Sequence, residues 1–166
     1  MTTKDIENVA YEYFWKKGTY LCYEIAAPKI KKRQTRHRER VDLLIYEASD
    51  EIWKCMEIKN TVADFHSAAK LSWWGDYNSY ILNSKIYDKV KDEIPDGIGV
   101  YLVYEDKEFG MYMKCVKRPK KMARKFTNDQ LIFALMQGLS REYKKYRKLK
   151  EQEIKKAVKT IKRKTK

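Results

Sequence analysis

The sequence VDLLIYEASDEIWKCMEIKN, residues 41–60, decides the fold because it has the pattern of a β-hairpin. Residues 41–46 and 52–60 are rich in β-branched, aromatic and long apolar side chains, and residues 48–50 between them are typical of a turn. If the chain reverses at residues 49–50, residues whose numbers sum to 99 face each other. This register predicts that Asp42 lies opposite Glu57.

Three charged side chains interrupt the two apolar arms of this hairpin: Asp42, Glu57 and Lys59. Glu57 and Lys59 are two positions apart and therefore share one face of a strand. Two carboxylates facing each other about 5 Å apart repel, and burial makes their charges costly unless a cation compensates them. A divalent cation compensates better than Lys59 alone, because hard cations prefer oxygen ligands. The alternative is a metal-free ion pair of Lys59 with Glu57 or Asp42.

The bulk composition predicts a basic globular protein. The chain has 166 residues, enough for one domain with an appendage, and 43% of them are hydrophobic. The net charge of +14 favours an acidic polymer or an anionic surface as partner. No apolar run is long enough to span a membrane and the start carries no apolar signal region, so we expect a cytoplasmic protein without membrane contact. Three cysteines far apart predict reduced core residues.

Local patterns predict alternating helices and strands. A helix over residues 3–17 ends at Gly18, a strand covers 19–25, the hairpin follows, and a helix covers 61–71. Strands over 79–84, 98–104 and 110–116 and a short helix over 85–93 complete a domain of residues 1–125. Residues 126–166 predict a basic C-terminal helix or tail. Its docking face is expected at Leu131, Ile132, Leu135, Met136 and Leu139.

Basic residues cluster in three places. Residues 28–40 hold seven Lys or Arg against one Glu and join the first strand to the Asp42 strand, which predicts a basic loop beside the carboxylates. Residues 117–125 form a second cluster, and residues 141–166 hold 13 Lys or Arg against three Glu. We expect nucleic-acid contacts, rather than a merely solubilising role, from Lys29, Lys31, Lys32, Arg33, Arg36, Arg38, Arg40, Lys117, Arg118, Lys120 and Lys121.

An Asp on one strand and Glu57-Ile58-Lys59 on the next resemble the active site of the PD-(D/E)XK nuclease superfamily, although Val41 stands where Pro precedes the Asp in the signature. Residues 56–65, 74–80 and 93–101 also resemble small MmcB-type DNA-repair proteins and similar small proteins carried by phages of Gram-positive bacteria. The resemblance covers about residues 3–125. It implies an α/β fold with an αβββαβ core, a mixed central sheet flanked by helices, and residues 1–125 as a nuclease-like domain.

The resemblance further implies a Mg²⁺- or Mn²⁺-dependent nuclease. It would hydrolyse phosphodiester bonds in DNA, branched or single-stranded DNA included, in repair, recombination or phage DNA metabolism. Asp42 and Glu57 would bind the metal, and Lys59 would position the attacking water or stabilise charge. An upstream acid usually completes such sites, and both Glu24 and Glu7 remain candidates. The alternatives are a nuclease-fold DNA-binding or repair-accessory module without catalysis, or a basic RNA-binding protein with structural carboxylates.

Overall fold

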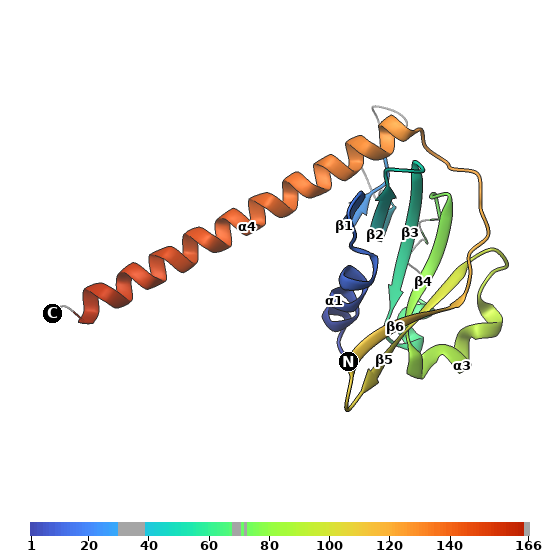
Figure 1. Cartoon of the computed structure of the whole chain (residues 1–166), viewed down its shortest axis with the longest axis horizontal. Helices are drawn as coiled ribbons and strands as arrows, with labels where there is room; N and C mark the ends of the chain where they lie inside the picture. The colour runs from blue at the N-terminus through green and yellow to red at the C-terminus, as the bar shows by residue number, and fades with distance from the viewer. Residues whose placement is uncertain (30–38, 68–70, 72, 165–166) are drawn as a thin grey trace.

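The computed structural model describes residues 1–29, 39–67, 71 and 73–164 (Figure 1). Within these residues, six strands form one mixed sheet in sequence order, with helices on both of its faces. The elements are α1 (Thr3–Phe14), β1 (Thr19–Ala26), β2 (Arg40–Glu47), β3 (Ile52–Lys59), α2 (Val62–Phe65), β4 (Tyr77–Asn83), η1 (Ser84–Ile86), α3 (Tyr87–Val90), η2 (Lys91–Glu93), β5 (Gly99–Asp106), β6 (Gly110–Lys117) and α4 (Asn128–Lys164). The predicted α/β class, mixed sheet and C-terminal helix are therefore confirmed.

The hairpin at the centre of the sheet has the predicted register. Strands β2 and β3 pair antiparallel from Leu43 with Met56 to Glu47 with Ile52. Strand β1 pairs antiparallel with β2, whereas β3, β4 and β5 are mutually parallel and β6 returns antiparallel to β5. The sheet is mixed because only the β3–β4 and β4–β5 connections cross over through helical segments.

Helix α1 begins with a capping box and ends earlier than predicted. The Thr2 hydroxyl accepts a hydrogen bond from the Asp5 amide, and the Asp5 carboxylate accepts one from the Thr2 amide. The predicted end near residue 17 is wrong, because the chain turns extended at Trp15 (φ −71°, ψ 120°). Gly18 instead adopts a left-handed φ of 82° in the turn that enters β1.

Each face of the sheet is covered by its own apolar cluster. Helix α1 covers one face, where Ile6, Ala10 and Phe14 pack on side chains of β2, β3, β4 and β5. The start of α4 covers the β1–β3 part of the opposite face, and α3 covers the β4–β5 part. The side chains of β2 and β3 alternate between these clusters, as half-buried strands require.

The first turns of α4 belong to the core of the domain. Leu131, Ala134 and Leu135 are buried against the sheet. Gly138 allows the helix to approach β1 closely, because a Cβ atom at this position would overlap the Cδ1 of Ile25. The docking face therefore includes Ala134 and Gly138, two small residues that the apolar pattern of the sequence did not identify.

Beyond these turns α4 projects away from the sheet (Figure 1). Met136 and Leu139, which were expected to dock, are 60% and 41% exposed, because the helix turns another face to the sheet. From Tyr143 to Val158 every side chain is exposed. The C-terminal half of this helix is thus a basic arm.

Helix α2 is much shorter than the predicted helix over residues 61–71. Thr61 caps it by accepting a hydrogen bond from the Asp64 amide. The helix ends at Phe65, and His66 turns so that its Nε2 lies 2.9 Å from Glu93 Oε2. Residues 68–70 of the predicted helix lie outside the described residues.

Candidate active site

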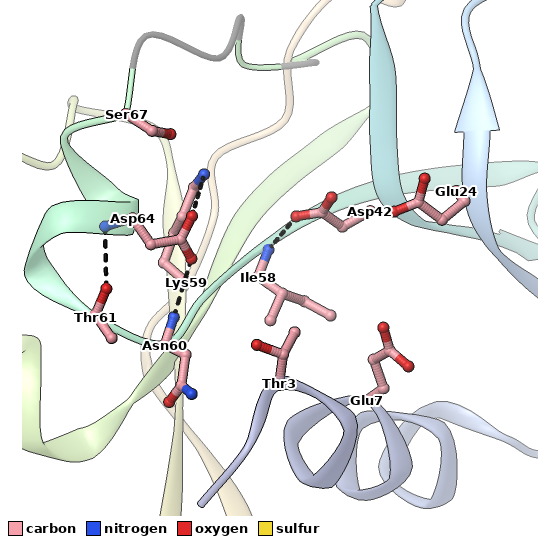
Figure 2. A pocket seen from close by; sticks show the side chains of 10 residues that line it. All are labelled: Thr3, Glu7, Glu24, Asp42, Ile58, Lys59, Asn60, Thr61, Asp64 and Ser67. Carbon is pink, nitrogen blue, oxygen red and sulfur yellow. Dashed lines mark hydrogen bonds and ion pairs between the residues drawn. The ribbon is translucent and has the colours of Figure 1, made fainter.

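A cavity opens where β2 and β3 part. Their hydrogen-bonded pairing stops at Leu43 and Met56, although β2 begins at Arg40 and β3 continues to Lys59. The cavity has a volume of about 490 Å³ and receives side chains from α1, β1, β2, β3 and α2 (Figure 2). Its lining residues are Thr3, Glu7, Glu24, Asp42, Ile58, Lys59, Asn60, Thr61, Asp64 and Ser67.

Asp42 is held in place by the neighbouring strand. One of its carboxylate oxygens accepts a hydrogen bond from the Ile58 amide at 2.8 Å (Figure 2). Burial, and to a smaller extent the negative charges of Glu24 and Asp64, raise the pKa of Asp42 above its ordinary value. The Ile58 hydrogen bond and the charge of Lys59 act in the opposite direction without reversing the shift. A carboxylate in this environment favours either a proton or a cation.

Lys59 brings a buried positive charge to the same cavity. Its side chain is 6% exposed, and its Nζ lies 3.5 Å from Asp64 Oδ1. Figure 2 shows the ammonium group and Asp64 on the side of the cavity opposite Asp42 and Glu24. Within the part of the chain that the structure describes, Lys59 pairs with Asp64, whereas the metal-free alternative expected a pair with Glu57 or Asp42.

Both candidate upstream acids line the cavity, from different elements. Glu7 points into it from α1 and also pairs with Lys4 at 2.8 Å. Glu24 lies in β1 opposite Asp42, because its neighbours Tyr23 and Ile25 pair with Leu43 and Val41. Of the two acids, Glu24 has the charge that acts on the pKa of Asp42.

The backbone of Glu24 is in an unusual conformation. Its φ is 57°, in the left-handed region that residues other than glycine rarely adopt. The Arg141 guanidinium of α4 donates hydrogen bonds to the carbonyl oxygens of Tyr23 at 2.7 Å and of Glu24 at 2.9 Å. Arg40 also pairs with the Glu24 carboxylate at 2.7 Å. The C-terminal helix thus holds the backbone from which Glu24 reaches the cavity.

Glu57 lies beside the cavity but does not line it. Its side chain is 4% exposed. In the parallel pairing of β3 with β4, Glu57 lies next to Tyr80. Burial, with a contribution from the Glu57 charge, raises the pKa of Tyr80 to about 12. Burial likewise raises the pKa of Cys55 to about 12, with the same carboxylate contributing. The structure therefore brings Asp42, Lys59, Glu24 and Glu7 to one cavity, while Glu57 is buried two positions before Lys59 in β3.

The predicted nucleic-acid-binding residues fall into three groups. Lys31, Lys32, Arg33, Arg36 and Arg38 lie outside the described residues. Arg40, the first residue of β2, pairs with Glu24 of the cavity lining, whereas Lys29 follows β1 and lies next to α4.

The second basic cluster, Lys117, Arg118, Lys120 and Lys121, lies apart from the cavity. Lys117 donates a hydrogen bond to the carbonyl oxygen of Pro95, and Lys120 pairs with Asp96 at 2.8 Å. These contacts occur around the turn before β5. The structure thus separates this cluster from the carboxylates.

Two residues of the site were not identified from the sequence. Asp64 could have been found, because Thr61 and Asp64 have the spacing of a helix cap directly after Lys59. Arg141 could not, because 117 residues separate it from Glu24 and no local pattern marks it among the many basic residues of α4.

The donor atoms of the cavity suit a hard divalent cation with an incomplete protein shell. Among the described residues, no group of three or more His, Cys, Asp or Glu side chains is arranged to hold a metal ion by itself. Mg²⁺ commonly takes one or two carboxylates and completes its shell with water and phosphate oxygens. Asp42 and Glu24, on facing positions of neighbouring strands, provide such a pair.

Comparison of this chain with models of protein families, with curated proteins and with solved structures finds no match. Within the described residues, no helix is both long and apolar enough to cross a lipid bilayer.

Proposed function

We propose that this protein is a metal-dependent nuclease that hydrolyses phosphodiester bonds in DNA at the cavity between β2 and β3. The observation that supports the proposal is the convergence of Asp42 and Lys59, from the diverging ends of two neighbouring strands, on one cavity with three further carboxylates, those of Glu7, Glu24 and Asp64. Such an arrangement provides negative groups for a cation and a positive group for a phosphate. The PD-(D/E)XK core that the sequence resembles orders its elements in the same way.

The residues of the cavity have separate tasks in this proposal. Lys59 places positive charge next to the scissile phosphate, where negative charge grows in the transition state. Because Asp64 pairs with Lys59 and Ile58 binds Asp42, both charged groups are oriented before substrate arrives. Glu7 or Glu24 would accept a hydrogen bond from the attacking water and align it with the phosphorus atom.

Mg²⁺ or Mn²⁺ would be held by Asp42 with Glu24, which both line the cavity, whereas Glu57, also predicted as a ligand, is not among the lining residues. When bound, the ion supplies positive charge that offsets the carboxylates and makes a nearby water more acidic. Without it, the acidic side chains of the cavity would repel a phosphate. The chain's own carboxylates therefore account for the expected metal dependence.

A binding module without catalysis is the second candidate. The observations that favour it are the burial of Glu57 and the engagement of Lys59 with Asp64. In that case the cavity would be a remnant of the nuclease arrangement, and the basic surface alone would recognise nucleic acid.

A cleavage assay tests the proposal directly. Linear, circular, single-stranded and branched DNA, and RNA, are incubated with the protein and Mg²⁺, Mn²⁺ or EDTA. We expect cleavage of DNA with a divalent ion, none in EDTA, and none by Asp42→Asn. Asp50→Asn, in the hairpin turn at the other end of β2 and β3, should cleave normally. Binding of nucleic acid without cleavage of any substrate would favour the second candidate.

Asp42→Asn should also stabilise the metal-free protein at neutral pH. Because the pKa of Asp42 is higher in the folded than in the unfolded protein, the protonated side chain stabilises the fold. This stabilisation is complete below pH 3.8, the ordinary pKa, and is lost as the pH rises through the pKa of the folded state. An Asn keeps the acceptor for Ile58 and removes the charge. We expect a gain of about 1 kcal/mol, the scale of one relieved like-charge contact, which grows with pH in thermal unfolding from pH 3 to 7.

Mg²⁺ should stabilise the wild type but not Asp42→Asn. It should stabilise the wild type by about 1.4 kcal/mol at ten times its dissociation constant and leave Asp42→Asn nearly unchanged. Ionic strength is held constant so that general screening cancels. Equal stabilisation of both proteins by Mg²⁺ would contradict a metal site at Asp42.

A further inference from the structure

A basic groove runs along α4 from the end of β1 to the start of the arm. Two hollows form it, of about 350 and 700 Å³, and they share Phe133 and Gln137 in their walls. None of the described residues in either wall is acidic. The basic residues of the walls are Lys29, Arg141, Lys144, Lys145 and Lys148.

Two lysines of this groove carry uncompensated charge. Lys145 and Arg141 each lie 2.9 Å from the Glu142 carboxylate, which partly neutralises them. Within the described part of the chain, Lys144 and Lys148 have no ion pair, and both are exposed. Four residues apart on a helix, they lie on the same face, one turn after the other. Their positive potential adds along the groove and attracts a polyanion.

The groove meets the catalytic cavity at one short piece of β1. Arg141 lines the groove and binds the carbonyl oxygens of Tyr23 and Glu24, while the Glu24 side chain lines the cavity. Lys29 continues the groove past the end of the same strand. A ligand that follows the groove therefore passes the segment of β1 that pairs with the Asp42 segment of β2.

We propose that this groove binds the sugar-phosphate backbone of a nucleic acid and directs it to the cavity. The choice of ligand rests on the proposed function. Uncompensated lysines four residues apart match the successive phosphates of a nucleic-acid backbone. The smaller hollow has walls from both α4 and residues 26–29, which suits a backbone better than the flat surface of a lipid bilayer.

The test is a binding measurement that does not depend on catalysis. Fluorescence anisotropy of a labelled DNA duplex is followed against salt concentration in EDTA, for the wild type and for Lys144→Gln/Lys148→Gln. If two phosphate contacts are lost, the negative slope of log K against log salt becomes shallower by about 1.8. Affinity then falls about 60-fold at 0.1 M salt, if the contacts act through counterion release alone.

Lys17→Gln/Lys107→Gln is the matched control, because both lysines are exposed, unpaired among the described residues and outside the groove. It changes the net charge equally and should leave the slope close to that of the wild type. Equal losses in both double variants would overturn the proposal, since only overall charge would matter. An unchanged duplex affinity together with lost binding to phosphatidylserine vesicles would overturn it in favour of a lipid surface.

The proposal of a nucleic-acid groove and the proposal of nuclease activity can be rejected independently. Cleavage by wild type with an unchanged slope in Lys144→Gln/Lys148→Gln rejects the groove and leaves the nuclease standing. The expected change of slope without cleavage of any substrate supports the groove and rejects catalysis. Circular dichroism of each variant confirms its fold, which the exposure of the four lysines leads us to expect.

Discussion

Lys59→Met is expected to lower the rate of DNA cleavage by about 10²–10³-fold, the usual loss when one preorganised electrostatic group is removed. The methionine fills nearly the same buried space, so the fold should persist, but the positive side chain that the proposal places beside the scissile phosphate is lost. The measurement is single-turnover cleavage with Mg²⁺, alongside duplex binding in EDTA. Binding should change much less than the rate, because Lys59 is 6% exposed and cannot carry much of the general affinity.

Lys54→Met provides the matched control for this prediction. Lys54 lies five residues earlier in the same strand and pairs with Glu47 at 2.9 Å, away from the cavity. Its loss should leave the cleavage rate within about twofold of the wild-type rate, since the residue does not approach the site. Cleavage by Lys59→Met at the wild-type rate would remove Lys59 from the mechanism and leave Asp64 as a purely structural partner.

Trp53→Ala is expected to have the largest effect on stability, a loss of about 3–5 kcal/mol in the free energy of unfolding. Trp53 is fully buried and stacks on Tyr46 with ring centroids 4.3 Å apart. Its indole nitrogen donates a hydrogen bond to Asn128 at the start of α4, at 2.7 Å. The substitution would therefore leave a cavity and also loosen α4 from the sheet. Urea denaturation measures the change.

Two further substitutions separate packing from hydrogen bonding. Trp53→Phe keeps an aromatic ring on Tyr46 but loses the bond to Asn128, so we expect a loss of about 1–2 kcal/mol, and this variant remains measurable if the alanine variant does not fold. Trp15→Ala removes an indole that is 60% exposed and should change stability by less than about 0.5 kcal/mol. Similar losses at positions 15 and 53 would contradict the packing of this core.

The hairpin was predictable because its determinants are local. Alternating apolar residues, a polar turn and a fixed register lie within 20 residues, and the observed pairs from Leu43–Met56 to Glu47–Ile52 follow the predicted sums. Asp42 and Lys59, both singled out on this hairpin, line one cavity from its opposite sides. The lengths of α1 and α2 were not predictable, because Trp15 and His66 leave helical geometry where no proline or glycine requires it.

By itself, the sequence determined the α/β class, the central hairpin and the basic character of the C-terminal helix, since each depends on periodicity or composition within a short segment. The mixed sheet was expected only from the family resemblance. The tertiary structure alone decided which acids meet. Glu7 and Glu24 converge on Asp42 from separate elements, Glu57 is buried beside Tyr80, and Arg141 binds the backbone of Glu24 across 117 residues. These contacts depend on how helices pack on the sheet, and side-chain volume and close approach, as at Gly138, set that packing without leaving a local pattern in the chain.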